Sequence, residues 1–316
     1  MRCFYCGKEI NKDSTDLEKS SLWHLKCIKQ FFDTTYFPEI ELNEKTLQNI
    51  ADTNVKKGLT VTGYQKKISL GFVNIQNKKL TILDNPTGFI IKPQVKEFPC
   101  MPESEYLVMQ MAKHTGIRTV QFSLIKTKSN YVYITKRIDR DKNHMLAMED
   151  FCQLNGRLTE DKYKGSYEQC AKTITRYSSR VGLDLSELYL RLVFCFVVGN
   201  SDMHLKNFSL IEEKENSNSY VLSDAYDLLP VQILLPSDID DTALTLNGKK
   251  RNLTKNDFLK FAENIGLSFL AGKKIINLVV SLEEEYISMI ENSYLSNKLK
   301  KSFKNILISR IKILNQ

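Results

Sequence analysis

The sequence lacks the marks of a fibrous, secreted or membrane protein. Its 316 residues include only 13 glycines and 7 prolines, which excludes collagen-like and low-complexity character. The opening residues Met1–Cys6 contain no apolar segment, so no secretory signal is expected. The most apolar run, residues 192–199, is much shorter than the roughly 20 residues that a membrane helix needs. We therefore expect a soluble, cytoplasmic protein.

Disulfide-scaffold and disordered classes are excluded as well. Seven cysteines, an odd number in a chain of this length, fit reduced thiols or metal ligands better than a disulfide framework. Hydrophobic residues make up 42% of the chain, which is enough to build a core. At roughly 150 residues per domain, the length predicts about two domains or lobes.

A small excess of basic residues gives a formal net charge of +8, from 45 Lys and Arg against 37 Asp and Glu. This charge would suit nucleic acid, but it would equally suit a cleft for a phosphate-bearing ligand such as ATP. Because the basic residues are spread along the chain rather than clustered, we interpret most of them as solvated surface.

Hydrophobic patterning predicts an α+β chain. A helix is expected at 102–114, because Pro102 lies at its start and Gly116 just beyond its end. The strands expected before and after this helix cover 58–72, 80–91, 119–126 and 131–138. Beyond Arg140 the pattern is mainly helical, with a strand-like exception at 220–222.

This order of elements predicts three parts: a small Cys/His knuckle at 1–35, a β-rich lobe with one helix at 36–140, and a helical lobe at 141–316. A cleft is expected between the two lobes. In the last segment, apolar residues at helical spacing (303, 307, 311 and 314) alternate with basic ones, which predicts packing in a helical bundle rather than a membrane-surface helix.

Two pairs of metal-ligand residues stand close to the N-terminus, Cys3-x2-Cys6 and His24-x2-Cys27. Tetrahedral zinc takes four nitrogen or sulfur ligands, and two closely spaced pairs supply them with little strain. Because four protein ligands close the coordination sphere, the zinc would be structural. The alternatives are four reduced side chains without metal, or a redox dithiol, which the missing βαβ context disfavours.

The segment 199–211 contains Asp202 and Asn207 five positions apart, and Asp227 follows about twenty residues later. Phosphoryl transfer needs an Asp to orient the attacking hydroxyl, and oxygen ligands to hold magnesium on the phosphates. The spacing suggests Asp202 as base, Asn207 and Asp227 as metal ligands, and Lys206 as a cation for the transferring group. A plain polar loop with Asn and Asp as turn formers is the alternative interpretation.

Candidate ATP-handling residues precede this segment in the order found in kinases. Gly63 lies between two strand-like runs whose backbone would cover phosphates. Lys92 ends a strand and would pair with phosphate oxygens, and Glu105 near the start of the next helix would pair with Lys92. Residues 135–138 would form the hinge between the lobes. Each has a simpler alternative, such as an exposed strand-end lysine or a favourable charge at a helix N-terminus.

Together these pieces resemble the HipA-like serine/threonine kinases, the toxins of bacterial toxin–antitoxin systems. The matching segments, in chain order, are TVTGYQKK (60–67), IK (91–92), SEY (104–106), RIDR (137–140), EDFCQ (149–153), GNSDMHLKNFS (199–209) and YD (226–227). Each segment alone is a weak indication of the family, but the whole set in this order is a specific one.

The resemblance implies a two-lobed protein-kinase-like fold, ATP with magnesium, and phosphorylation of a protein serine or threonine. The cofactor-binding positions it implies are Lys92, Glu105, Gly63, Gln65, Lys136, Ile138, His204, Asn207 and Asp227. It also implies autophosphorylation in the Gly loop, at Thr60 or the neighbouring Thr62. Family targets are typically aminoacyl-tRNA synthetases.

The chain departs from the longer HipA members, because fewer than sixty residues precede the Gly loop and the knuckle fills part of them. This is similar to the short HipT type, in which a small HipS-like protein supplies the missing subdomain and a HipB-like antitoxin binds DNA. Two other functions stay open: a non-catalytic, zinc-stapled module for nucleic acid or a repressor complex, and a kinase-like enzyme acting on a lipid or small molecule.

Overall fold

The computed structural model describes residues 1–40, 68–72, 79–82, 88–127, 130–141 and 144–316. The chain divides into two compact units. The first comprises residues 1–106 and 120–138, and the second comprises residues 107–119 and 139–316. The predicted knuckle therefore belongs to the same unit as the predicted β-rich lobe. Helix α5 (Met101–Thr115) contributes its first turns to one unit and the rest to the other.

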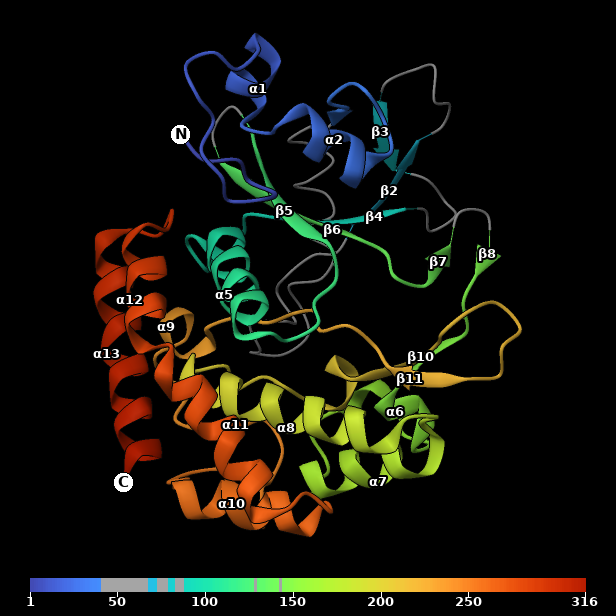
Figure 1. Cartoon of the computed structure of the whole chain (residues 1–316), viewed down its shortest axis with the longest axis vertical. Coiled ribbons are helices and arrows are strands. Elements are labelled where there is room, and N and C mark those ends of the chain that lie inside the picture. Colours follow the sequence, from blue (N-terminus) through green and yellow to red (C-terminus); the bar gives the residue numbers. More distant parts are fainter. Residues whose placement is uncertain (41–67, 73–78, 83–87, 128–129, 142–143) are drawn as a thin grey trace. The chain divides into compact units, whose positions relative to one another are not determined.

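A six-stranded sheet forms the centre of the first unit (Figure 1). Its strands, in spatial order, are β1 (Glu39–Ile40), β3 (Lys79–Ile82), β2 (Ile68–Phe72), β4 (Phe89–Pro93), β6 (Tyr131–Lys136) and β5 (Phe122–Lys126). Neighbours are antiparallel except β1 and β3. The middle four residues of β6 are all buried, as expected for a strand covered on both faces.

The N-terminal segment packs onto this sheet through aromatic side chains. It contains helices α1 (Asp16–Ser21), which begins at a Thr15–Glu18 capping box, and α2 (Leu25–Phe32). The rings of Phe31 and Phe32 contact Phe89 of β4 at 5.6 and 5.4 Å. The fully buried Trp23 also donates a hydrogen bond from Nε1 to the Leu124 carbonyl of β5, at 3.2 Å. The knuckle and the sheet therefore share one core.

The second unit is mainly helical, as the pattern beyond Arg140 predicts. Its helices are α6 (Phe151–Leu154), α7 (Tyr167–Tyr177), α8 (Val181–Val197), α9 (Val231–Leu234), α10 (Lys255–Asn264), α11 (Phe269–Ser281), α12 (Glu283–Glu291) and α13 (Asn297–Asn315), with short 3-10 turns η2 (Thr159–Asp161) and η3 (Leu205–Asn207). Helix α13 buries the four apolar residues at 303, 307, 311 and 314, which confirms bundle packing of the C-terminal segment. Among the described residues, no helix is long and apolar enough to cross a membrane.

Short strands add a second, three-stranded sheet to this unit, in the order β11 (Tyr220–Leu222), β10 (Ser209–Glu212) and β9 (Met148–Asp150). The strand expected at 220–222 is confirmed. Strand β9 and the hairpin of β7 (Arg140–Asp141) with β8 (His144–Met145) were not expected. They are two or three residues long, too short to show an alternating pattern, and exist because neighbouring strands pair with them.

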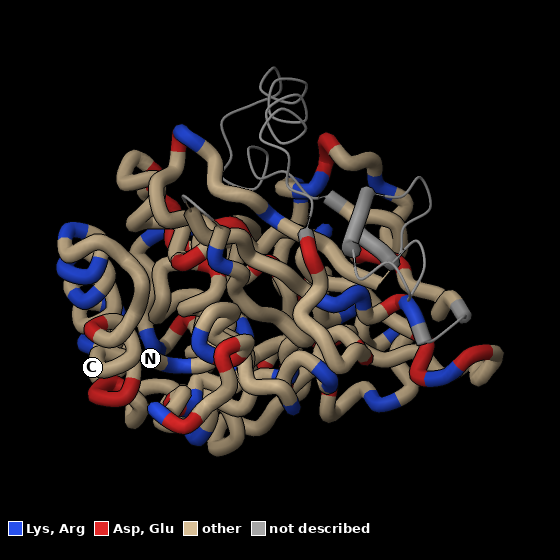
Figure 2. The backbone as a smooth tube through the Cα atoms, turned by 90° about the horizontal axis from the view of Figure 1, so that it is seen from above, with Lys and Arg blue, Asp and Glu red and all other residues tan. Residues whose placement is uncertain are grey.

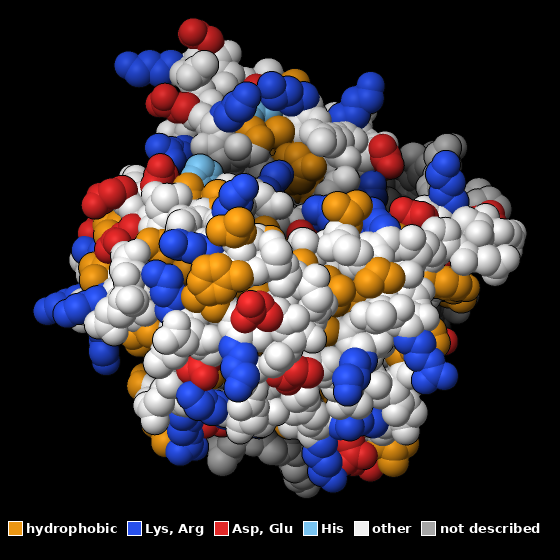
Figure 3. Space-filling view, turned by 60° about the horizontal axis from the view of Figure 1, so that its bottom comes forward, with side chains coloured by type: hydrophobic (Ala, Val, Ile, Leu, Met, Phe, Trp, Pro, Cys, Tyr) orange, Lys and Arg blue, Asp and Glu red, His pale blue; other side chains and the backbone are white. Residues whose placement is uncertain are grey.

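Charged residues of both signs are interspersed along the chain (Figure 2). On the face drawn in Figure 3, Lys and Arg side chains alternate with Asp and Glu, and hydrophobic side chains are scattered among them. The net charge of +8 is therefore not gathered into one basic area on this face.

Candidate active site and metal centre

The loop with Asp202 follows directly on helix α8. Gly199 has φ of +66°, and a Cβ there would lie 3.1 Å from both Gln232 and Ile306, so only glycine fits this turn. Asp202 is 6% exposed. Its amide donates to Asn200 Oδ1 at 3.2 Å, and its carbonyl accepts from Asn207 Nδ2 at 2.8 Å. The predicted base and the predicted metal ligand are thus joined within one hydrogen-bonded loop.

Tyr163 approaches the same carboxylate from a preceding loop. Its hydroxyl donates to Asp202 Oδ1 at 2.6 Å, and its ring packs edge-on against His204, with ring centroids 5.0 Å apart. The hydrogen bond therefore fixes the orientation of the Asp202 carboxylate. The contact was not predicted, because the two residues are 39 positions apart and Tyr163 belongs to no motif.

Lys206 forms an ion pair with Asp150, with Nζ 2.5 Å from Oδ2. Asp150 also caps helix α6 in a reciprocal capping box with Gln153. The cation predicted to face the transferring phosphoryl group is therefore held by a carboxylate of the EDFCQ segment. The role of Lys206 in phosphoryl transfer stays a prediction.

Asp227 lies just beyond strand β11 in a left-handed conformation, with φ of +58°, and is 6% exposed. A left-handed residue other than glycine costs roughly 1–2 kcal/mol, although Asp tolerates it better than most. The preceding Tyr226 is bonded to the loop of Asp202: its hydroxyl contacts Ser209 Oγ at 2.6 Å and donates to the Lys206 carbonyl at 3.2 Å. Burial raises the pKa of this phenol well above its ordinary value. Asp227 therefore follows a residue that is anchored to the predicted catalytic loop.

The side chains of Asn207 and Asp227 both offer oxygen atoms, which are the ligands that magnesium prefers. The amide nitrogen of Asn207 is used in its bond to the loop backbone, so its Oδ1 is the atom left to coordinate a cation. The Asp227 carboxylate supplies a charged oxygen. The donor set therefore fits Mg²⁺ rather than a softer metal.

The first unit contains the Lys92–Glu105 ion pair, which joins β4 to helix α5. Both side chains are almost completely buried, at 1% and 0% exposure, and the Lys92 ammonium also lies 5.2 Å from the centroid of the Tyr133 ring. Burying a charged pair costs desolvation energy, so such pairs need good geometry to persist. The simpler interpretation of Lys92, an exposed strand-end lysine, is wrong, because this lysine is buried and paired.

The other predicted cofactor residues are only partly described. Lys136 ends β6 and forms an ion pair with Asp33 at 3.6 Å, and Ile138 is half-buried. Thr60, Thr62, Gly63 and Gln65 lie outside the described residues.

The four predicted zinc ligands come together in the first unit. The ligand atoms of Cys3, Cys6, His24 and Cys27 all lie within 4.8 Å of one another. His24 Nδ1 lies 3.3 Å from the Cys6 sulfur and 4.0 Å from the Cys27 sulfur. For three sulfurs and one nitrogen, bonds of about 2.3 Å to sulfur and about 2.0 Å to nitrogen place tetrahedral ligand atoms roughly 3.5–3.8 Å apart. The cluster therefore has the dimensions to hold a metal ion.

Two further contacts suit metal binding. The His24 Nε2 atom lies 3.1 Å from the Glu9 carbonyl, which fixes Nε2 as the protonated nitrogen and leaves Nδ1 for a metal. Burial by itself raises the pKa of the Cys6 thiol, but hydrogen bonds with the Lys8 amide and the Cys27 and His24 side chains lower it to about 7. Burial and the neighbouring thiols have the opposite effect on Cys27: they raise its pKa, so this thiol would lose its proton when a metal binds. Thiolates are the form that binds metal.

The fold and these residues define an α+β protein of the kinase-like class. The chain is similar to a solved chain of the Shewanella oneidensis MR-1 toxin–antitoxin complex of HipA, HipB and operator DNA, with a TM-score of 0.73, 16% identity, and coverage of 85% of this chain and 70% of that one. It is also similar to the Helicobacter pylori proinflammatory kinase CtkA, with a TM-score of 0.54, 18% identity, and coverage of 78% and 94%.

The family model for the HipA-like C-terminal domain matches residues 59–289, so the chain belongs to this family. A putative kinase of Haemophilus influenzae is 25% identical over 76% of this chain and 77% of its own length. The putative kinase Y4mE of Sinorhizobium fredii is 28% identical over 74% of this chain and 58% of its own length. The chain thus spans little more than half of the second relative. It is a HipA-like kinase by family and fold.

Proposed function

We propose that this protein is an ATP- and magnesium-dependent serine/threonine protein kinase that acts as the toxin of a toxin–antitoxin system. The observation that carries the proposal is the hydrogen-bonded loop of Asp202 and Asn207 in a chain of the HipA-like family. The buried Lys92–Glu105 pair supports it, because a phosphate-binding lysine needs a carboxylate to hold its side chain in place.

The proposed reaction assigns each side chain one role. Asp202 accepts the proton of the substrate hydroxyl while that oxygen bonds to the γ-phosphorus of ATP and the bond from this phosphorus to the ADP oxygen breaks. Asn207 and Asp227 hold magnesium on the phosphates, and Lys92 binds phosphate oxygens. Lys206 lowers the energy of the charge on the transferring group. Gly63, Gln65, Lys136, Ile138 and His204 contribute to binding ATP.

The proposed partners follow from the family and the solved relatives. The Shewanella structure contains HipA with HipB and operator DNA, which supports a HipB-like antitoxin as a partner here. A small HipS-like protein is proposed as a second partner. The proposed substrate is an aminoacyl-tRNA synthetase, and the proposed self-phosphorylation sites are Thr60 and Thr62.

The test is incubation of the purified chain with labelled ATP and Mg²⁺, followed by phosphopeptide mapping. We expect label at Thr60 or Thr62 and its loss in Asp202→Ala. The control is Asp257→Asn, which alters another buried carboxylate, on helix α10. Persistent labelling of the Asp202→Ala protein would show that Asp202 is not the base. Phosphoproteomics after induced expression of wild type and Asp202→Ala would identify the substrate.

We also propose that the cluster of Cys3, Cys6, His24 and Cys27 binds one structural zinc ion. Its support is the set of four convergent ligand atoms and the oriented His24 ring. Metal analysis of gently purified protein should give one zinc per chain. A chain without zinc that keeps its buried Trp23 would contradict the proposal.

A further inference from the structure

Helix α8 carries charged side chains on one face of an otherwise apolar helix. Asp184, Glu187 and Arg191 are spaced i, i+3 and i+7, so they lie along one side. Asp184 is 0% exposed and Arg191 is 1% exposed. Burying such groups is costly unless each is paired and hydrogen-bonded. The hydrogen-bond partners of these three side chains therefore show which segment of the chain they hold in place.

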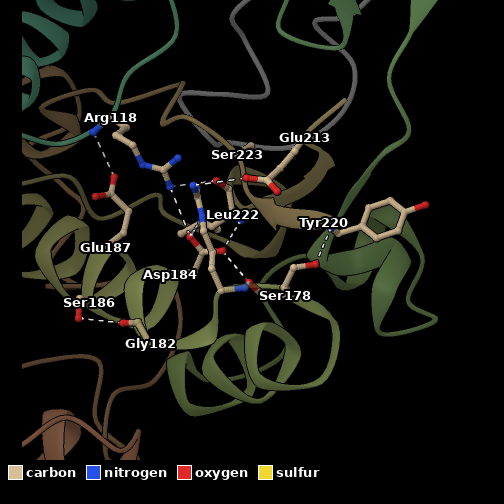
Figure 4. Close-up of polar contacts among 12 residues, drawn as sticks. Arg118, Ser178, Gly182, Asp184, Ser186, Glu187, Glu213, Tyr220, Leu222 and Ser223 are labelled. Atoms are coloured by element: carbon tan, nitrogen blue, oxygen red, sulfur yellow. Dashed lines mark hydrogen bonds and ion pairs between the residues drawn. The ribbon is translucent and has the colours of Figure 1, made fainter. Parts of the chain in front are cut away.

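Asp184 binds strand β11 (Figure 4). Its Oδ2 accepts the Leu222 amide at 2.7 Å and the Ser178 hydroxyl at 2.7 Å, and its Oδ1 accepts Arg180 Nε at 3.0 Å. A side chain thus takes the hydrogen bond that a neighbouring strand would otherwise supply at the edge of the three-stranded sheet. Asp184 fixes the position of the last residue of β11.

Arg191 binds the next residue. It donates from NH2 to the Ser223 carbonyl at 2.7 Å and from Nε to Glu187 Oε1 at 3.0 Å. Glu187 also accepts the backbone amide of Arg118 at 3.2 Å (Figure 4). The carboxylate therefore connects Arg191 to a third charged residue.

Arg118 contacts the same segment. Its NH2 donates to the Leu222 carbonyl at 3.1 Å, its NH1 lies 3.7 Å from Asp224, and its carbonyl accepts the Ala225 amide at 2.7 Å. Together, Asp184, Arg191 and Arg118 bind backbone groups of Leu222, Ser223 and Ala225. The segment that they hold leads directly into Asp227.

We infer that Asp184, Arg191 and Arg118 are positioning residues for Asp227. Asp227 is buried and holds a left-handed backbone, a conformation that persists only where the surrounding structure fixes it. A simple packing role does not require charge, because apolar side chains of similar volume would fill the same space without desolvation cost. Here the charged residues form hydrogen bonds with the backbone of residues 222–225. Such bonds fix the segment that leads to the Asp227 carboxylate. The inference rests on the proposed function, in which Asp227 holds magnesium.

Asp184→Asn is the main test, because it keeps the volume and removes the charge. We expect the Mg²⁺ concentration for half-maximal autophosphorylation to rise at least fivefold, with a smaller fall in the rate at saturating Mg²⁺. We also expect faster hydrogen exchange of the amides of 222–227. Arg118→Gln should raise the same Mg²⁺ concentration by a smaller factor. Because the Arg118 side chain is partly exposed, this variant serves as the test if Asp184→Asn does not fold.

The matched control is Asp257→Asn. Asp257 is also buried and accepts a backbone amide, from Thr254 at 2.9 Å, and a lysine, from Lys249 at 2.8 Å. It should change neither the Mg²⁺ dependence nor exchange at 222–227. An unchanged Mg²⁺ dependence in Asp184→Asn, with or without faster exchange, would overturn the inference.

The failure of the proposed function has a different signature. Wild-type protein that transfers no phosphate with Mg²⁺ would refute the kinase activity itself. Binding of Mn²⁺ with ATP, followed by electron paramagnetic resonance, then decides the inference alone. Weaker binding in Asp184→Asn than in wild type and Asp257→Asn supports positioning, and equal binding, or none, refutes it.

Discussion

Single residues in the second unit show how a loop motif becomes a candidate site. The spacing of Asp202 and Asn207 is a property of the sequence. The structure adds a hydrogen bond between these two residues and a second one from Tyr163 to Asp202. Tyr163 reaches Asp202 only because the loop before helix α7 folds against the loop after helix α8. Such contacts follow from packing of distant segments, so no local pattern predicts them.

Tyr163→Phe should slow autophosphorylation about tenfold, because the carboxylate loses the bond that orients it. The rate is measured with labelled ATP at saturating Mg²⁺. Tyr286→Phe is the control, because it also removes a hydroxyl bonded at 2.6 Å, to Thr115. Equal rates for the two variants would contradict the prediction.

Lys92→Met should lower the free energy of unfolding by about 3–5 kcal/mol, because Glu105 is left buried without its cation. The double variant Lys92→Met with Glu105→Leu should recover most of this loss. Both should lack ATP-dependent labelling, since the proposed function assigns phosphate binding to this lysine. Urea unfolding followed by Trp23 emission measures the unit that contains the pair. Labelling of the stable double variant would show that Lys92 has no role in binding ATP.

Secondary-structure elements were predicted best where local signals are strong. Helix α5 begins and ends within one residue of the predicted 102–114, since Pro102 and Gly116, with φ of +94°, mark its ends. The strand predicted from Thr119 begins only at Phe122. The reason is tertiary: Thr119 pairs with Ala225 in the second unit. Thr119 therefore pairs with Ala225 instead of extending strand β5.

At the same scale, removal of zinc should loosen helices α1 and α2 and expose Trp23, the only tryptophan in the chain. A chelator should shift the Trp23 emission to the red and lower the melting temperature, because the ligands hold the segment whose aromatic side chains pack on β4. Cys6→Ser should do the same without chelator. Cys100→Ser, which removes a thiol outside the cluster, should do neither. Unchanged emission after complete zinc removal would refute the structural role.

Charge is the property of the whole molecule that first suggested nucleic acid. Both signs are interspersed along the chain in Figure 2 and on the face drawn in Figure 3, whereas affinity for a phosphate backbone needs cations that act together. The basic side chains on that face are therefore those expected of a solvated surface.

The isolated chain should accordingly show no salt-dependent binding of duplex DNA. Fluorescence anisotropy with a labelled 20-base-pair duplex at about 50 mM salt tests this, because electrostatic binding is strong there and falls steeply as salt rises. Tight binding by the isolated chain, lost by 200 mM salt, would favour the nucleic-acid-binding alternative.

The sequence by itself determined the ends of helix α5, the bundle face of the last helix, the set of four convergent Cys and His side chains, and the family. These depend on residue type and spacing along the chain, which capping, periodicity and short motifs record directly. Only the tertiary structure decided that the knuckle shares a core with the sheet, that Tyr163 bonds to Asp202, and that charges on α8 hold the segment before Asp227. The physical reason is that buried polar groups must find partners wherever the fold brings them, and these partners lie far away in the sequence.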